Sequence, residues 1–442
     1  MKEFLCGVIE GFYGRPWTMK QRLELFSWMQ GWGMNTYMYG PKDDLKMRAA
    51  WRELYDDSEL NDLRMLLRAC QDKNISFIYT IAPGLDIRYA DPNDLQALKN
   101  KVDQLLNQGV KHLCVLFDDI PHSMNEVDEK HFGSFARAQA YVANELLEYT
   151  RKHTDGLFLF CPTDYCERMA KPSISESTYL QELGEYLHQD IDVFWTGPEI
   201  VSETISPQSI RELQRVLQRE PVIWENLHAN DYDIRRVYFG PFAGRPLELR
   251  SEIKGILSNP NNEFEANFVP LRTLALYSRE ECYESRAAYS QALKEWLPRF
   301  KTHGKEAITL EELELLGDLF YLPFEHGERA KEVLEAAKKL LSSQTIRDDE
   351  LELLATTARA VGKLFEKLTE LDNRDLLYSL YSYVWEIRHE LDYLVAYLKW
   401  LQGGKPDGRF GRPDKIANTF RGGVSAEIEK LLPMDETGEF LL

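Results

Sequence analysis

The sequence predicts an α/β fold, in which a (β/α)8 TIM-type barrel over residues 1–295 is followed by an all-α helical bundle over residues 296–442. Three observations support this prediction. Eight short apolar runs alternate with helical patterns up to about residue 290, every run ends in polar, aromatic or turn-forming residues, and strand signals stop near residue 300. With 442 residues, 44% of them hydrophobic, the chain is long enough for one large and one smaller domain.

The apolar runs are the expected strands of the barrel. The segments between them, such as 92–109 and 206–220, carry apolar residues at helical spacing and begin with Pro or Ser. Repeated strand–helix units form a parallel sheet with crossover helices. A doubly wound open sheet is the alternative, although no GxGxxG motif follows the first run and no Walker-type glycine loop occurs. The expected strands cover residues 4–11, 36–44, 76–84, 112–120, 157–165, 192–198, 221–226 and 255–260.

The helical part contains a heptad pattern. From Leu377 to Leu401 the apolar residues follow one another at alternating intervals of three and four, as in the a and d positions of a coiled coil. Two interpretations stay open: an antiparallel bundle closed within one chain, with partner helices in 308–343 and 347–371, or an interface between subunits. The other predictions for the C-terminal end are a loop over 403–413 and a short helix over 424–432.

The composition limits the classes of function. Lys and Arg total 53 against 72 Asp and Glu, and the net charge of -19 disfavours a nucleic-acid partner. The first 14 residues are too acidic for a signal peptide, and no apolar run reaches the length of a membrane span. The six cysteines lack CxxC spacing and lie mostly in apolar segments, which is typical of buried free thiols in a reducing compartment. These features predict a cytoplasmic protein with neither a nucleic-acid nor a membrane partner.

In a barrel of this kind the carboxyl ends of all eight strands meet at one face, where active sites are built. The side chains expected there are carboxylates, aromatics and amides, which suit the apolar CH faces and the hydroxyl groups of a sugar ring. The histidines show no metal-binding spacing and no EF-hand pattern occurs, so we predict neither a metal nor a cofactor. The expected face residues are Tyr13, Lys42, Asp43, Asp44, Asp118, Asp119, Asp164, Tyr165, Trp195, Trp224, Asn226, Asn230, Asp231 and Asn259.

Asp118 and Asp119 are adjacent carboxylates at the end of the fourth apolar run. On a regular strand their side chains would point to opposite faces. A Mg²⁺ or Mn²⁺ site and a cap on a helix that begins near Ser123 are competing interpretations. An ordinary retaining glycosidase places its two carboxyl groups on opposite sides of the anomeric carbon, which neighbouring residues on one loop reach only with difficulty.

The adjacent pair fits better if the sugar supplies its own nucleophile. In a 2-acetamido sugar the acetamido oxygen can attack the anomeric carbon. One aspartate then accepts the acetamido N–H, while the other protonates the leaving oxygen and afterwards activates water. The pair therefore favours substrate-assisted hydrolysis of an N-acetylhexosaminide.

Seven motifs, in order along the predicted barrel, resemble glycoside hydrolase family 84: GVIEGFYGRPW, YGPKDD, LFDDI, FCPTDYC, FWTGP, VIWENLHANDYD and SNPNNEFEAN. LLGDLFYLPFEHG, YSYVWEI and FRGGVSAEIEKLLP resemble the helical stalk domain of the same family. The resemblance implies a retaining, metal-independent β-N-acetylglucosaminidase that removes O-linked GlcNAc from Ser or Thr of proteins through an oxazoline intermediate. It also implies a homodimer formed through the helical domain.

The resemblance implies a role for each matching residue. Asp118 resembles the residue that orients and polarises the acetamido group, and Asp119 resembles the general acid/base. Two alternatives stay open: an exo-β-hexosaminidase or hyaluronidase-like enzyme acting on glycans, and a non-catalytic sugar-binding barrel, which would be expected to lack one of the two aspartates. The implied sugar-binding residues are Gly11 through its backbone, Lys42 toward a hydroxyl, Tyr165 toward the acetamido oxygen, Trp224 and Asn226 as pocket lining, Asp231 toward the ring hydroxyls, and Asn259.

Overall fold

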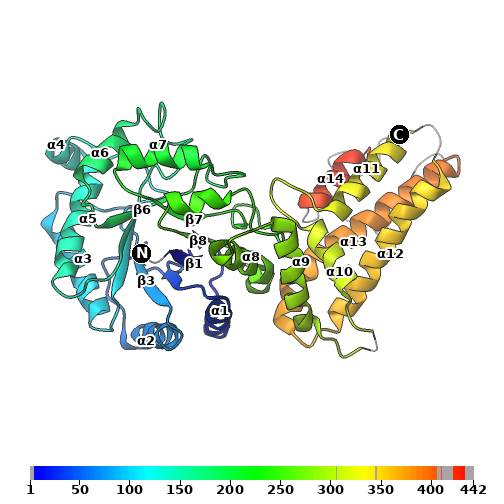
Figure 1. Cartoon of the computed structure of the whole chain (residues 1–442), viewed down its shortest axis with the longest axis horizontal. Helices are drawn as coiled ribbons and strands as arrows, with labels where there is room; N and C mark the ends of the chain where they lie inside the picture. The colour runs from blue at the N-terminus through cyan, green and yellow to red at the C-terminus, as the bar shows by residue number, and fades with distance from the viewer. Residues whose placement is uncertain (1–3, 305, 344–345, 406–409, 411–421, 434–442) are drawn as a thin grey trace. The chain divides into compact units, whose positions relative to one another are not determined.

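Eight parallel strands close into a barrel in the computed structural model, which describes residues 4–304, 306–343, 346–405, 410 and 422–433 (Figure 1). The strands follow sequence order and β8 pairs with β1, so the sheet has no free edge. The (β/α)8 prediction is confirmed, and the open doubly wound alternative is wrong. The strands are β1 (Leu5–Glu10), β2 (Thr36–Tyr39), β3 (Ser76–Ile81), β4 (His112–Leu116), β5 (Phe158–Cys161), β6 (Ile191–Trp195), β7 (Val222–Glu225) and β8 (Gly255–Ser258).

Several strands stop short of the predicted runs at their carboxyl ends. β2 ends at Tyr39 instead of residue 44, and β4 ends at Leu116 instead of residue 120. The polar tails of these runs therefore lie in loops beyond the hydrogen-bonded ladder. Side chains in such loops do not have to alternate between the two faces of a sheet.

The crossover helices begin at caps that are visible in the sequence. Thr18 forms a capping box with Gln21 at the start of α1, and Asp91 caps α3, whose first residue is Pro92. The helices are α1 (Met19–Trp32), α2 (Asp57–Asp72), α3 (Pro92–Leu106), α4 (Glu126–Phe132), α5 (Phe135–Arg151), α6 (Thr178–Tyr186), α7 (Pro207–Leu217) and α8 (Phe268–Arg279), with 3-10 turns η1 (Leu247–Glu252) and η2 (Phe264–Asn267).

A packed apolar core fills the barrel. Next to this core, β1 and β2 approach so closely that position 7 must be Gly, because a Cβ on Gly7 would lie 1.7 Å from the carbonyl oxygen of Thr36. The same core extends to Tyr165 and Trp224, two of the predicted site residues. Every strand contributes to this core, for example through Ile9, Met38, Ile78, Leu116, Leu159, Phe194, Val222 and Leu257.

Two compact units divide the chain by spatial contact. The first holds the residues up to Asp231 together with Phe242–Asn262 and Leu274–Tyr283, and the second holds Tyr232–Pro241, Glu263–Thr273 and the residues from Glu284 onward. Each unit therefore combines several separate segments of the sequence, and no single position divides the two. The domain boundary at residue 295 stays a prediction.

The second unit is helical, and α12 packs along α13 within it. The heptad residues from Leu377 to Leu398 lie on α13 and are buried inside the single chain. This arrangement matches the closed bundle, so the seam itself is not an open surface. The short helix predicted over 424–432 is present as α14, whereas most of the predicted loop over 403–413 lies outside the described residues. The helices of this unit are α9 (Ser285–Trp296), α10 (Leu310–Leu319), α11 (Glu328–Ser342), α12 (Asp348–Thr369), α13 (Arg374–Gln402) and α14 (Gly423–Leu431), with the 3-10 turn η3 (Leu297–Phe300).

Across the described ranges, no helix has an apolar stretch long enough to cross a membrane.

Candidate active site

All nine predicted site residues lie at or just beyond the carboxyl ends of barrel strands. They follow or end β1, β2, β4, β5, β7 and β8, which are neighbours around the closed sheet or one strand apart. This is the face of a (β/α)8 barrel where active sites are built. The residues are Gly11, Lys42, Asp118, Asp119, Tyr165, Trp224, Asn226, Asp231 and Asn259.

The two aspartates occupy a sharp turn after β4. The strand ends at Leu116, and Asp119 adopts a left-handed backbone conformation with a φ of 51°. A residue other than Gly is uncommon in this conformation. The turn removes the strict alternation of a strand, so both carboxylates can serve one site. Neither aspartate caps the next helix, because Asn125 is the N-cap of α4.

Asp118 is a buried carboxylate with one oxygen left available. Its Oδ2 accepts a hydrogen bond from Lys42 Nζ at 2.8 Å. Its Oδ1 is buried and has no hydrogen-bond partner among the described residues. Burial raises the pKa of Asp118, but the charge and hydrogen bond of Lys42, together with the charge of Arg48, outweigh this effect and lower the pKa. Asp118 is therefore an ionised carboxylate whose Oδ1 can accept a further hydrogen bond.

Asp119 is exposed, and two phenols hold its carboxylate. Tyr165 donates to Oδ1 at 2.9 Å and Tyr13 donates to Oδ2 at 3.1 Å. Burial, followed by the charge of Asp119, raises the pKa of both phenols, so both stay protonated donors. The Tyr13 ring also lies 5.5 Å from Lys42 Nζ. Tyr13 therefore contacts Asp119 through its hydroxyl and lies beside Lys42, the hydrogen-bond partner of Asp118.

A buried polar relay ties the loops after β4 and β5 together. Thr163 Oγ1 donates to the carbonyl oxygen of Phe117 at 2.8 Å, and Gln139 Nε2 donates to Thr163 Oγ1 at 2.8 Å. Phe117 directly precedes Asp118, and Thr163 lies two residues before Tyr165. The relay therefore positions the residue before the aspartate turn and links it to the loop that carries Tyr165. Sequence reasoning missed Gln139 and Thr163, since only their contacts reveal them.

Trp224, Asn226 and Asn259 form a second hydrogen-bonded group. Trp224 Nε1 and Asn259 Nδ2 both donate to Asn226 Oδ1, at 3.1 and 3.0 Å, while Asn226 Nδ2 donates to the carbonyl oxygen of Ile200 at 2.8 Å. These bonds settle the orientation of the Asn226 amide. Asn259 Oδ1 is buried without a partner in the described part of the chain. This oxygen is an acceptor available to a hydroxyl group.

Gly11 and Asp231 shape the loop after β1. A Cβ on Gly11 would lie 2.9 Å from Trp224 Cζ2 and 2.8 Å from Ile9 Cγ2, so no side chain fits. Asp231 Oδ2 accepts from the backbone N–H of Tyr13 at 2.8 Å. Asp231 thus anchors the residue whose hydroxyl binds Asp119.

Other residues expected at this face bind protein groups. Asp44 accepts from the hydroxyl groups of Tyr39 and Tyr55, at 2.9 and 2.6 Å, and Asn230 accepts from the backbone N–H of Asn262 at 2.9 Å. These contacts hold the loops in place. Asp44 and Asn230 are therefore supports of the site.

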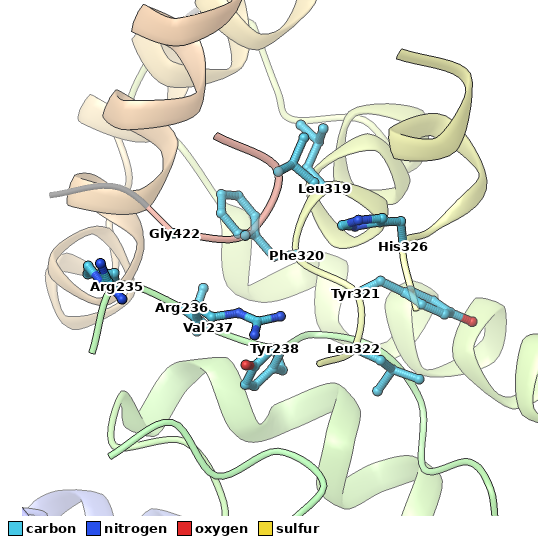
Figure 2. A pocket seen from close by; sticks show the side chains of 12 residues that line it. Arg235, Arg236, Val237, Tyr238, Leu319, Phe320, Tyr321, Leu322, His326 and Gly422 are labelled. Atoms are coloured by element: carbon cyan, nitrogen blue, oxygen red, sulfur yellow. The ribbon is translucent and has the colours of Figure 1, made fainter. Parts of the chain in front are cut away.

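Two further features bear on whether the chain carries chemistry of another kind. Within the described ranges, no three His, Cys, Asp or Glu side chains come together as a set of metal ligands. A hollow in the helical unit, lined by residues that include Arg236, Tyr238, Tyr321 and His326, has no carboxylate in its lining (Figure 2). It therefore lacks the acid that glycoside hydrolysis needs.

Comparisons with known proteins show the family to which the chain belongs. The model of a family described as beta-N-acetylglucosaminidase matches residues 6–311. The chain is 30% identical to Protein O-GlcNAcase of Rattus norvegicus and to that of Mus musculus, each alignment covering 98% of this chain and 70% of the relative. A solved variant of the Thermobaculum terrenum O-GlcNAc hydrolase matches with a TM-score of 0.80 and 26% identity, over 91% of this chain and 86% of that one. The chain therefore belongs to the β-N-acetylglucosaminidases of glycoside hydrolase family 84, and it is a glycoside hydrolase.

Proposed function

We propose that this chain is a retaining β-N-acetylglucosaminidase that removes O-linked GlcNAc from Ser or Thr of proteins by substrate-assisted catalysis. One observation carries the proposal. The buried Oδ1 of Asp118 has no partner among the described residues, and it lies on the same turn as Asp119, whose carboxylate two phenols hold. An acceptor of this kind matches the N–H of an acetamido group.

In the first step Asp118 accepts the acetamido N–H and increases the electron density on the acetamido oxygen. This oxygen attacks the anomeric carbon, while Asp119, as the acid, gives its proton to the leaving oxygen of the Ser or Thr side chain. The bond between the anomeric carbon and the leaving oxygen breaks, and the oxazoline forms in its N-protonated (oxazolinium) state, with its N–H still hydrogen-bonded to the carboxylate of Asp118. Lys42 balances the charge of Asp118 throughout.

In the second step Asp119, now a carboxylate, takes a proton from water. The water oxygen attacks the anomeric carbon from the face that the leaving group vacated, and the oxazoline opens to the acetamide. Two inversions at one carbon give net retention. Asp119 recovers its proton, so each turnover consumes one water and releases GlcNAc.

The sugar-binding roles proposed for the site are those that the family resemblance implies. We assign the acetamido oxygen to Tyr165, whose hydroxyl lies beside Asp119, and ring hydroxyls to Lys42, Asp231 and Asn259. We assign Gly11 a backbone contact with the ring. Trp224 and Asn226 line the pocket and give it an apolar wall and a fixed amide.

The proposal also specifies that the GlcNAc is attached to a protein and not to a glycan. The relatives from rat and mouse carry the name Protein O-GlcNAcase, and the Thermobaculum terrenum structure is called an O-GlcNAc hydrolase. Parallel incubations with an O-GlcNAc-modified protein, chitobiose and an N-glycan test this point. We expect release of GlcNAc from the protein at the highest kcat/KM. Preference for either glycan would instead support the exo-β-hexosaminidase or hyaluronidase-like alternative.

We also propose a homodimer formed through the helical domain. Tyr378, Tyr381 and Trp385 share one face of α13 and stay 69%, 45% and 40% exposed. Three exposed aromatic side chains on one face of a helix favour a contact between copies of the chain. Light scattering should give a dimer for the wild type and for Leu23→Arg, a barrel-surface control, and a monomer for Trp385→Arg. A monomeric wild type would contradict the proposal.

The location in the cell is the last part of the proposal. Cys6, Cys70, Cys114, Cys161 and Cys166 are buried free thiols, and Cys282 is exposed. Free thiols persist in a reducing compartment, which supports a cytoplasmic location. Fractionation of the native cells tests it, and recovery outside the cytoplasmic fraction would contradict it.

A further inference from the structure

Arg48 lies in the same segment after β2 as Lys42. Its side chain is buried, with 8% of the residue exposed, and its Nη2 donates a hydrogen bond to the backbone carbonyl oxygen of Asp119 at 3.1 Å. Its guanidinium carbon lies 6.0 Å from the centroid of the Tyr13 ring, and the Tyr13 hydroxyl binds the Asp119 carboxylate. Arg48 therefore contacts both the backbone of Asp119 and a partner of its side chain.

The carbonyl that Arg48 binds belongs to the left-handed residue of the turn. A residue other than Gly keeps this conformation only where its surroundings hold it. Tyr13 and Tyr165 bind only the carboxylate of Asp119. Because this side chain can rotate, their hydrogen bonds do not by themselves fix the backbone conformation of Asp119. The bond from Arg48 acts on the peptide group itself. It therefore selects the orientation of the turn.

Arg48 also provides charge near Asp118. The ionisable groups that face Asp118 are Lys42 and Arg48 after β2, Tyr13 after β1, Asp119 and Cys114 of the β4 region, and Cys161 and Tyr165 of the β5 region. Lys42 and Arg48 are the cations of this set. Lys42 uses Oδ2 of Asp118, whereas Arg48 acts through its charge. Oδ1 therefore stays available to the substrate.

We propose that Arg48 is a positioning residue for the hydrolysis: it holds the Asp118–Asp119 turn in the conformation that presents both carboxylates to one sugar, and it supplies a second positive charge beside Asp118. This inference rests on the proposed substrate-assisted function. Arg48 acts through the aspartates and makes no contact with the sugar in this role.

Three variants separate the two contributions. Arg48→Met removes both the hydrogen bond and the charge, Arg48→Lys keeps the charge, and Arg48→Gln keeps a neutral donor. Arg52→Met is the matched control. Arg52 lies four residues further on, and it pairs with Asp86 at 2.6 Å and Asp94 at 2.7 Å instead of with the aspartate turn. The readout is the pH profile of kcat and kcat/KM on 4-nitrophenyl 2-acetamido-2-deoxy-β-glucoside.

We expect kcat of Arg48→Met to fall about 100-fold with little change in KM, because the turn loses its productive geometry. The acidic limb of kcat/KM should move up by about one pH unit, because Asp118 loses a neighbouring cation. Arg48→Lys should keep the limb at the wild-type pH, and Arg48→Gln should shift it while retaining more kcat than Arg48→Met. Arg52→Met should leave both the limb and kcat unchanged.

An unmoved acidic limb in both Arg48→Met and Arg48→Gln would overturn the inference, as would an equal shift in Arg52→Met. If Arg48→Met does not fold, the pair Arg48→Lys and Arg48→Gln decides the question alone. The wild-type rate on the N-trifluoroacetyl analogue keeps the two proposals apart. An unaffected rate there overturns the substrate-assisted function, whereas a reduced rate with unmoved limbs overturns only the role of Arg48.

Discussion

Lys42 Nζ lies 2.8 Å from Asp118 Oδ2, and the two side chains are only 4% and 9% exposed. The residues are 76 positions apart in the sequence, so the ion pair joins the loops after β2 and β4. It occupies one oxygen of Asp118 and leaves the other without a partner among the described residues. The ion pair therefore keeps Asp118 ionised. It also leaves Oδ1, and not Oδ2, as the oxygen that can accept a hydrogen bond from a substrate.

Lys42→Met should damage both stability and activity. Removing one partner of a buried ion pair leaves the other charge uncompensated, which costs about 3–5 kcal/mol. We expect that loss in urea unfolding, together with a fall of kcat/KM of at least about 100-fold. Lys46→Met is the control, because the Lys46–Glu59 pair is more exposed and should contribute little. Equal effects of the two substitutions would contradict the special place of Lys42.

Asp119→Ala should lose activity according to the leaving group. A general acid matters most when the leaving oxygen is basic and contributes about 10²–10⁴-fold. We expect the variant to retain more activity on aryl glycosides with good leaving groups than on those with poor ones. The measurement is kcat/KM across a series of substituted phenyl glycosides. A uniform loss would show that Asp119 is not the acid.

Asp118→Asn should slow the reaction with every leaving group, because the amide no longer attracts the acetamido N–H as a carboxylate does. In the wild type, an N-trifluoroacetyl substrate should react much more slowly than the N-acetyl one, since fluorine weakens the acetamido oxygen as a nucleophile. Rates on the two substrates measure this directly. No difference between them would exclude attack by the acetamido group.

Asp94 should contribute a pH-dependent part of the stability. Burial raises the pKa of Asp94, but hydrogen bonds from Arg52 and Arg88 outweigh burial and hold the pKa well below its usual range. A carboxyl whose pKa falls on folding stabilises the native state above its unfolded pKa and loses that contribution as the pH falls. Asp94→Asn should therefore be less stable than the wild type at pH 7, and the difference should shrink below about pH 4.

Urea unfolding at a series of pH values between neutral and acid measures this change. Asp349→Asn serves as the control, because it removes an exposed carboxylate paired with Arg347 and should change the unfolding curves little. A difference between Asp94→Asn and the wild type that stays constant with pH would refute the linkage.

Arg245 and Glu225 should behave as one unit. Arg245 Nε lies 2.7 Å from Glu225 Oε2, and the two side chains are 0% and 1% exposed. Glu225 directly precedes Asn226, so the pair supports the pocket wall after β7. Arg245→Met should cost about 3–5 kcal/mol of unfolding free energy, and Glu225→Gln in the same chain should recover part of it. Additive losses in this double-mutant cycle would show that the pair is uncoupled.

Local patterns explain why much of the fold could be predicted. The alternation of apolar runs with helical segments reports each strand and helix from its own residues, and the caps at Thr18 and Asp91 mark where two helices begin. The carboxyl ends of parallel strands then place Lys42, Asp118 and Tyr165 at one face without any knowledge of their contacts. The heptad pattern on α13 predicted a buried seam but not its partner, which proves to be the chain's own helices.

By itself, the sequence determined the eightfold repeat and the presence of adjacent carboxylates, aromatics and amides at the carboxyl ends of the strands, and it predicted the site residues among them. Only the tertiary structure decided that β4 stops at Leu116 and that Asp119 is left-handed, which frees the neighbouring carboxylates from the alternation of a strand. It also decided that Arg48 binds the Asp119 carbonyl and that Thr163 binds the Phe117 carbonyl. These contacts join residues that are 71 and 46 positions apart. A sequence pattern records the preferences of neighbouring residues, whereas such contacts exist only once the strands have closed the barrel.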